Sequence, residues 1–209
     1  METVSTINQR ISANKFDASQ TLDHKIIEEI ISLACQAPSS FNIQHWRFVV
    51  VTASEAKERL KAAAFGQPKV SEAAATIIVL GDLKAHEHLA ETLEPSVQQG
   101  IVPAPVRDQF VTMAQGMYAN PQASRDEAIR SGALAGMALM LAATDKGLAT
   151  GPMIGFDPQA VCREFSIAER YIPVMLITLG TAISGNWPRK PRLPLSKVLA
   201  WESGKSFPG

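Results

Sequence analysis

Residues 37–46 read Ala-Pro-Ser-Ser-Phe-Asn-Ile-Gln-His-Trp and join a helical pattern to an apolar run. Apolar residues recur at roughly helical spacing over residues 26–34, which predicts an amphipathic helix. The run 48–51 is apolar and largely β-branched, as is typical of a buried strand. A helix-to-strand connection needs only a few residues, yet this one carries two hydroxyls, two carboxamides and a proline. The residues alone leave two interpretations open: these groups cap the helix and satisfy loose backbone, or they form part of a binding site.

The composition is that of one globular domain without a charge excess. The chain has 209 residues, which suits a single large domain. A globule of this length buries on the order of 70% of its unfolded surface, so a large core needs no disulfides. Twenty basic and twenty acidic residues cancel, whereas a nucleic-acid-binding domain usually shows a clear basic excess. We therefore expect one domain over residues 1–209 and no nucleic-acid partner.

The sequence also bears on the compartment. Cys35 and Cys162 lie far apart in apolar helical patterns and are interpreted as core residues in a reducing cytosol. The first fifteen residues are polar and lack the apolar segment of a signal peptide. The longest apolar run, 133–143, is interrupted by Gly136 and is too short to cross a bilayer. These features predict a cytoplasmic protein with no membrane partner.

Hydrophobic periodicity predicts many helices and few strands. Helical patterns lie at about 2–10, 23–36, 54–64, 68–75, 84–96, 104–118, 123–147 and 157–165, and β-branched runs at about 46–52, 76–81 and 172–180. Asp157-Pro158 is a strong helix start, because Asp caps the helix and Pro suits its first position. The proline-rich stretch 188–194 is expected to be extended. The pattern indicates an α+β fold with a small central sheet.

The segment 131–143 is apolar on nearly every helical face. Such a helix must be surrounded on all sides, and Gly132 and Gly136 would let another backbone approach closely. Enclosure inside one chain and sharing across a subunit boundary both explain the pattern.

Familiar catalytic motifs are missing from this sequence. It holds no Gly-x-Gly-x-x-Gly after a strand, no Walker-type Gly-Lys-Ser/Thr and no Gly-x-Ser-x-Gly. His86 and His88 are two residues apart, so a helix would point them to different faces, which favours a solvated surface over a metal pair. We expect no metal site, and an enzyme with so few acids and nucleophiles would rely on a cofactor.

Five motifs together resemble those of the FMN-dependent nitroreductase family. They are Pro38–Trp46 with the Phe-Val-Val-Val run that follows, Arg10-Ile11-Ser12, Gly66-Gln67, Pro152-Met153-Ile154-Gly155-Phe156-Asp157 and Arg189-Lys190-Pro191-Arg192. They stand in the family's order and span nearly the whole chain. The resemblance implies a nitroreductase-like α+β fold, in which helices flank a small mixed central β-sheet, and an intertwined homodimer with the 131–143 helix at its centre.

A flavin mononucleotide needs cations for its phosphate, which carries close to two negative charges. By the resemblance, Arg10, Lys190 and Arg192 bind the phosphate, with Ile11, Ser12 and Asn14 beside them. Asn14 departs from the family pattern, because many relatives have a second basic residue there. Without the resemblance, these cations could equally be ordinary surface residues.

The resemblance also assigns contacts to the flavin ring and ribityl chain. Pro38, Ser39 and Ser40 lie against the flavin of the partner subunit, while Asn42, Gln67 and Lys69 supply polar contacts. Pro152, Ile154 and Gly155 also contact the flavin, and the Ile154-Gly155 turn offers a backbone N–H toward the reactive flavin nitrogen, a fixed dipole that needs no titrating group; the alternative is a plain turn. His45 replaces a common proline and is interpreted as a structural histidine rather than a substrate contact.

The implied function is an FMN-dependent NAD(P)H oxidoreductase that reduces nitroaromatic and quinone-type acceptors by a ping-pong mechanism. No side chain is expected to act as a catalytic acid or base, since flavin N5 would carry the hydride. The same scaffold also hosts dehalogenation and the reduction of small carbonyl compounds or enones, so a dedicated reductase is a second hypothesis. A non-catalytic flavin-binding module and a helical interaction protein are the hypotheses from other classes.

Overall fold

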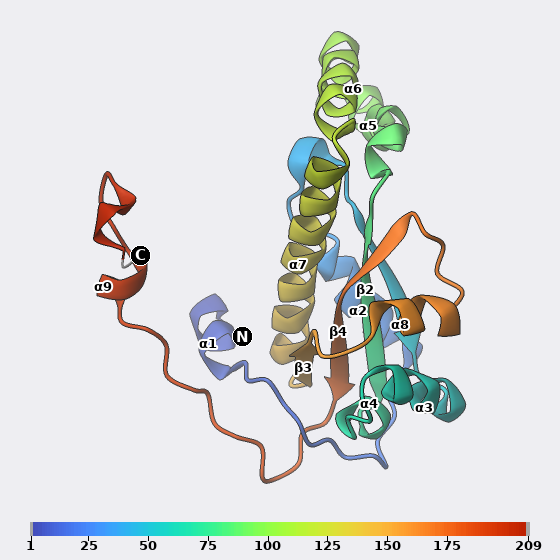
Figure 1. Ribbon diagram of the computed structural model, residues 1–209, viewed down its shortest axis with the longest axis vertical. Helices are drawn as coiled ribbons and strands as arrows, with labels where there is room; N and C mark the ends of the chain where they lie inside the picture. Colours follow the sequence, from blue (N-terminus) through green and yellow to red (C-terminus); the bar gives the residue numbers. More distant parts are fainter. Residues whose placement is uncertain (1, 208–209) are drawn as a thin grey trace.

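The computed structural model describes residues 2–207 and has helices on both faces of one sheet (Figure 1). The helices are α1 (Thr3–Gln9), α2 (His24–Ala34), α3 (Ser54–Ala63), α4 (Lys69–Glu72), α5 (Leu89–Gln98), α6 (Ala104–Tyr118), α7 (Pro121–Asp145), α8 (Pro158–Glu164) and α9 (Leu195–Val198). The strands are β1 (Trp46–Val51), β2 (Ala75–Asp82), β3 (Ala149–Met153) and β4 (Tyr171–Gly180), and the short 3₁₀ turns are η1 (Ser40–Asn42), η2 (Ala85–His88) and η3 (Gly204–Ser206). The expected α+β class is confirmed.

Four elements differ from the sequence-based expectation. Neither β3 nor the short helix α9 was predicted. The helix expected at 84–96 is a 3₁₀ turn followed by α5, and the helix expected at 68–75 ends at Glu72 because β2 begins at Ala75. The stretch 188–194 is extended, as predicted.

The sheet has the strand order β1-β2-β4-β3, and all three strand pairs are antiparallel. A mixed sheet was expected. Among the described residues, the parallel character is confined to an isolated bridge between Ser12 and Thr150, which places the N-terminal segment along the outer edge of β3. That edge tolerates Pro152, because an edge strand need not donate every ladder hydrogen bond.

The core consists of two layers divided by β2, which is buried at all of its residues. Successive strand residues point to opposite faces. Ile77 and Val79 pack with α2 and α7 on one face, while Ile78 and Leu80 pack with α3 and α8 on the other. Both faces are therefore dry, which explains why the strand is a continuous apolar run rather than an alternating one.

Helix α7 was expected to be surrounded on every side, and within this chain that holds for one face only. Ala135 and Leu139 are fully buried against the sheet. On the opposite face, Leu134 and Met137 are 42% and 38% exposed. Within residues 2–207, no helix is both long enough and apolar enough to cross a membrane.

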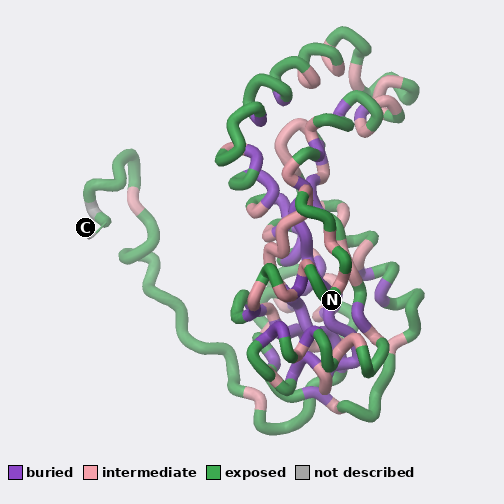
Figure 2. The backbone as a smooth tube through the Cα atoms, turned by 45° about the vertical axis from the view of Figure 1, so that its right-hand side comes forward, coloured by how far each residue is buried: buried purple, intermediate pink, exposed green. Residues whose placement is uncertain are grey.

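Two further parts lie at the margins of the layered core. Helices α5 and α6 stand together at the end of the molecule where α7 begins (Figure 1), over a small core that includes Ile43, Leu89 and Tyr118. The C-terminal arm, residues 187–207, leaves the body as an extended and almost wholly exposed chain (Figure 2). It exposes large apolar side chains, among them Trp187 (65%) and Trp201 (80%).

The close approach of the N-terminal segment to β3 depends on Gly151. A Cβ atom at this position would lie 2.4 Å from both the Ala13 carbonyl oxygen and Thr178 Oγ1. We expect Gly151→Ala to lower the free energy of unfolding by about 2 kcal/mol, as is usual for overpacking. Urea denaturation measures this change. Gly116→Ala in α6 is the control. A Cβ added at Gly116 would meet no neighbouring segment within 4 Å, so this change should raise the free energy of unfolding by about 0.5–1 kcal/mol. Equal stability of Gly151→Ala and the unchanged protein would contradict the packing argument.

Candidate functional site

A cationic pocket of about 130 Å³ forms where the N-terminal segment meets the start of the C-terminal arm. Its lining brings together six of the residues assigned from sequence: Arg10, Ile11, Ser12, Asn14, Lys190 and Arg192. Trp187, Pro188 and Arg189 complete the wall. Arg189 and Trp187 were not assigned from sequence, although Arg189 stands within the quoted Arg-Lys-Pro-Arg motif.

The pocket is electrostatically suited to an anion. Arg10 Nη1 is buried and has no hydrogen-bond partner among residues 2–207. Burial lowers the pKa of the Arg10 guanidinium, and the nearby charges of Arg189 and Arg192 lower it further. A half-buried guanidinium with one buried, unpartnered nitrogen beside like charges is unfavourable, and a phosphate dianion would relieve both penalties through charge-assisted hydrogen bonds. The residues present therefore fit a phosphate group.

A second cluster lies at the turn after β3. Gln67 Nε2 donates to the Gly155 carbonyl oxygen over 2.7 Å, and Lys69 Nζ donates to Asn14 Oδ1 over 3.2 Å. Burial lowers the pKa of the Lys69 ammonium. The structure thus links residues 67–69 to Gly155, in the turn that follows β3, and to the pocket wall. Ile154 at this turn is 80% exposed, an unusual position for a large apolar side chain.

The loop 38–44 has a constrained backbone. Phe41, Asn42 and Gln44 all have positive φ, at 51°, 58° and 59°. Non-glycine residues in this region cost of order 1–3 kcal/mol each, with Asn the most tolerant, and they persist only where the surroundings hold them. Ser39 Oγ accepts the Gln44 N–H over 2.9 Å, and Glu127 of α7 accepts the Ser40 N–H over 3.5 Å. The polar groups of this loop therefore do more than end α2.

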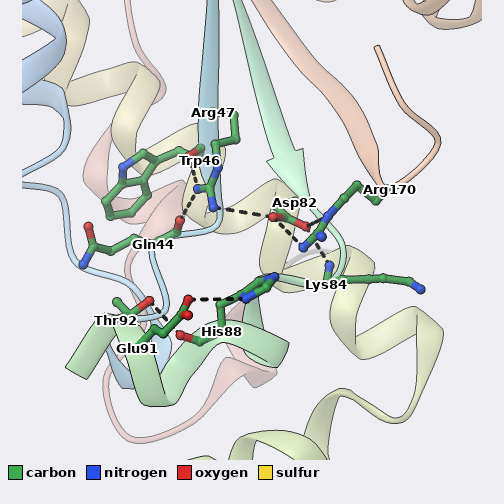
Figure 3. A network of polar contacts seen from close by, with 9 residues as sticks. All are labelled: Gln44, Trp46, Arg47, Asp82, Lys84, His88, Glu91, Thr92 and Arg170. Carbon is green, nitrogen blue, oxygen red and sulfur yellow. Dashed lines mark hydrogen bonds and ion pairs between the residues drawn. The ribbon is translucent and has the colours of Figure 1, made fainter. Parts of the chain in front are cut away.

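Figure 3 shows a charge network around the buried carboxylate of Asp82, which anchors the end of this loop. Arg170 donates two hydrogen bonds of 3.0 Å to the carboxylate of Asp82, which also pairs with Arg47 at 3.5 Å. Arg47 in turn donates to the Gln44 carbonyl oxygen over 2.9 Å. A buried carboxylate needs such partners. Sequence reasoning missed this network, whose one signal is an aspartate that ends an apolar run.

His45 is fully buried, which supports its interpretation as a structural residue. Its Nδ1 lies 3.4 Å from Ser131 Oγ, and Ser131 donates to Glu127 over 2.9 Å. Its Nε2, however, is buried without a partner in the described part of the chain. Burial lowers the pKa of His45 to about 4, so the ring is neutral at pH 7.

The expectation of a solvated surface at His86 and His88 is half right. His88 is exposed and pairs with Glu91, whereas His86 is half-buried, with its ring centroid 5.5 Å from that of Tyr118. Within residues 2–207, the His, Cys, Asp and Glu side chains form no group able to hold a metal ion.

The parts of the candidate site do not all meet within one chain. Loop 38–44 touches α7 at Glu127, whereas Arg10 and Ile11 lie beside Thr144 at the other end of this helix. Thr144 lies seventeen residues after Glu127 in α7, a rise of about 25 Å along the helix. Pro38, Ser39, Ser40 and Asn42 are thus remote from the cationic pocket of their own chain.

The fold and the pocket define an α+β protein whose cationic pocket fits a phosphate group, and comparison with known proteins identifies the family. The profile of the nitroreductase family matches residues 7–181. YodC of Bacillus subtilis, a candidate NAD(P)H nitroreductase, is 36% identical over 199 residues, which cover 95% of this chain and 98% of the relative. The chain belongs to the nitroreductase family.

Two other relatives bear on the chemistry. The solved structure of a candidate nitroreductase of Exiguobacterium sibiricum, in complex with FMN, is 33% identical with a TM-score of 0.89, and the match covers 97% of this chain and 98% of that one. An enone reductase of Lactiplantibacillus plantarum is 29% identical over 178 residues, which cover 83% of this chain and 82% of the relative. The resemblance seen in the sequence is confirmed: the protein is an oxidoreductase of the FMN-dependent class that uses NAD(P)H.

Burial of His45 predicts a loss of stability in mild acid. The unfolded chain binds a proton at His45 below about pH 6.5, but the folded protein does so only near pH 4. The stability that the folded state gains by keeping His45 neutral is therefore fully present above pH 6.5. About 2 kcal/mol of the free energy of unfolding is lost by pH 5.

Urea denaturation at pH 7 and pH 5 measures this loss, and His45→Gln should reduce the difference between the two values by about that amount. His24→Gln, a change at an exposed helix start, is the matched control and should leave the difference nearly unchanged. An equal difference in the unchanged protein and His45→Gln would rule out His45 as the source.

Proposed function

We propose that this protein reduces nitroaromatic and quinone-type acceptors with electrons from NAD(P)H, at two FMN sites shared between the subunits of a homodimer. One observation carries the proposal: the cationic pocket with the buried, unpartnered Nη1 of Arg10. This pocket fits the phosphate of FMN, and residues 67–69 link it to the turn after β3, because Gln67 donates to Gly155 and Lys69 donates to Asn14.

Each cluster has a role in this proposal. Arg10, Lys190 and Arg192 bind the phosphate, with Ile11, Ser12 and Asn14 in the same wall. Gln67 and Lys69 orient the polar edge of the cofactor, and the backbone of Pro152, Ile154 and Gly155 faces its reactive part. Bound FMN supplies reversible hydride transfer, which this chain's own side chains cannot perform. The protein binds, orients and shields the cofactor, and solvent supplies the protons.

The homodimer explains three features of the isolated chain. The 38–44 loop contacts one end of α7 and the N-terminal segment lies beside the other end, about 25 Å along the helix, so the loop would complete the site of a partner. The exposed face of α7, with Leu134 and Met137, needs an apolar cover. The C-terminal arm also exposes apolar side chains that a second subunit would bury.

Cys35 and Cys162 are both free thiols, which suits the proposed site of action in the cytoplasm.

An absorption spectrum followed by anaerobic titration tests the activity. We expect the protein purified with FMN to show an oxidised flavin spectrum, to bleach on addition of NADH or NADPH, and to recover its colour with menadione or nitrofurazone. A bound flavin that neither nucleotide bleaches would indicate a non-catalytic binding module instead. Failure to retain flavin after incubation with excess FMN would contradict the proposal as a whole.

Subunit complementation tests the shared site. Arg10→Ala removes a phosphate contact, and Asn42→Gly removes the loop carboxamide while tolerating the positive φ at that position. We expect each variant alone to be nearly inactive. Co-expression should restore about a quarter of the wild-type activity, because random pairing gives half heterodimers, each with one intact site of two.

Purified heterodimers carrying two different affinity tags provide the control, with about half the wild-type activity. No recovery in either preparation would show that both residues serve the same site of one chain.

The enone reductase relative supports a second candidate, reduction of a carbonyl-conjugated double bond. It differs from the first only in the acceptor, so turnover of a small enone by the reduced protein, measured beside menadione, decides between them. Dehalogenation would be revealed in the same assay by halide release from a halogenated aromatic.

A further inference from the structure

The side chain of Asn186 joins the two segments that build the cationic pocket. Its Oδ1 accepts the backbone N–H groups of Asn14 and Lys15 over 2.7 and 3.0 Å. Its Nδ2 donates to the carbonyl oxygens of Lys15 and Ile183 over 2.8 and 3.0 Å. A carboxamide has two acceptor lone pairs and two donor hydrogens, so every hydrogen-bonding position of this side chain is used.

The local backbone explains how Asn186 reaches these partners. The segments run side by side before it: the N–H of Asp17 donates to the Thr181 carbonyl over 2.9 Å, and Phe16 bridges to Ala182. Gly185 then adopts φ +87°, a conformation that favours glycine, and turns the chain so that Asn186 faces the N-terminal segment. Beyond this point the chain leaves the body as the exposed arm (Figures 1 and 2).

The position of Asn186 matters because the pocket cations lie on both sides of it. Arg10 is on the N-terminal segment, whereas Lys190 and Arg192 are on the arm. Their like charges repel, and that repulsion favours separation of the two segments. We call the four hydrogen bonds of Asn186 the Asn186 clamp. Trp187 directly follows Asn186 and also helps to place Lys190, whose Nζ lies 4.6 Å from the centre of the Trp187 ring.

We infer that Asn186 is a positioning residue: it holds the cations of the C-terminal arm against those of the N-terminal segment, and so sets the geometry of the phosphate pocket. Asn186 does not itself line the pocket. This inference rests on the proposed FMN function. Loss of the clamp should therefore weaken recognition of the phosphate more than recognition of the flavin ring.

Comparison of FMN with riboflavin tests this role, because the two differ only by the phosphate. Dissociation constants are measured by quenching of flavin fluorescence on full-length wild type and Asn186→Ala. We expect wild type to prefer FMN strongly and Asn186→Ala to lower that preference about tenfold or more, with a smaller change in riboflavin affinity. Asn186→Ser, whose hydroxyl can keep one of the four bonds, should fall between them and serves if the alanine variant does not fold.

Asp23→Ala is the control for a general loss of stability. Asp23 caps α2 by accepting the Lys25 N–H over 2.9 Å, outside the pocket lining. Removal of such a cap lowers the stability of the folded protein, and the preference for FMN should not change.

The possible outcomes distinguish failure of the positioning role of Asn186 from failure of the proposed FMN function. If wild type binds FMN tightly and both Asn186 variants keep its full preference over riboflavin, the positioning role is wrong. An equal loss of FMN and riboflavin affinity also overturns it, because that pattern indicates a general structural role. If wild type itself does not bind FMN, the proposed function fails.

Discussion

Burial of β2 on both faces is the constraint on which the rest of this structure depends. An apolar strand that is dry on both sides requires a helical layer on each, and α2 with α7 and α3 with α8 supply these layers. The strand ends in Asp82, its one ionisable residue, whose side chain is 1% exposed. That charge must be paired, and Arg170 and Arg47 pair with it. Through Arg47, the same network fixes the end of the 38–44 loop.

Several features that oppose folding lie at or beside the candidate site. The positive φ angles of Phe41 and Gln44, the unpartnered Arg10 Nη1 and the unpartnered His45 Nε2 each carry a cost. Arg10 and the 38–44 loop lie in motifs that the family resemblance had singled out, and His45 directly follows that loop. Most of the remaining chain obeys local rules, as with the N-caps Asp157 and Asn120, whose side chains accept hydrogen bonds from the first helical turns. Local conflicts of this kind are expected where a site is built for a ligand rather than for stability.

The sequence was sufficient for the fold class and for most helices, because these depend on periodicity within one segment. Strand β3 escaped prediction because Gly151 and Pro152 are poor strand formers, and only the pairing with β4 makes the segment a strand. The pocket cations followed from motif resemblance. The Asn186 clamp did not, since its bonds to Asn14 and Lys15 join residues more than 170 positions apart. A hydrogen bond between such distant residues leaves no pattern in a single sequence. The pairing of Asp82 with Arg170 could not be predicted for the same reason.

In the proposed dimer, cofactor binding and subunit association become linked. The phosphate pocket belongs to one chain and the 38–44 loop of the same site to the other, so a ligand that needs both halves binds the dimer better than the monomer. By mass action, that ligand then stabilises the dimer by the same free energy. The C-terminal arm belongs to both processes: its first residues carry Lys190 and Arg192, and its later residues expose Leu195 and Trp201 for burial. Asn186 lies where the arm leaves the body. A partner that binds the later residues of the arm would therefore also help to keep Lys190 and Arg192 beside Arg10.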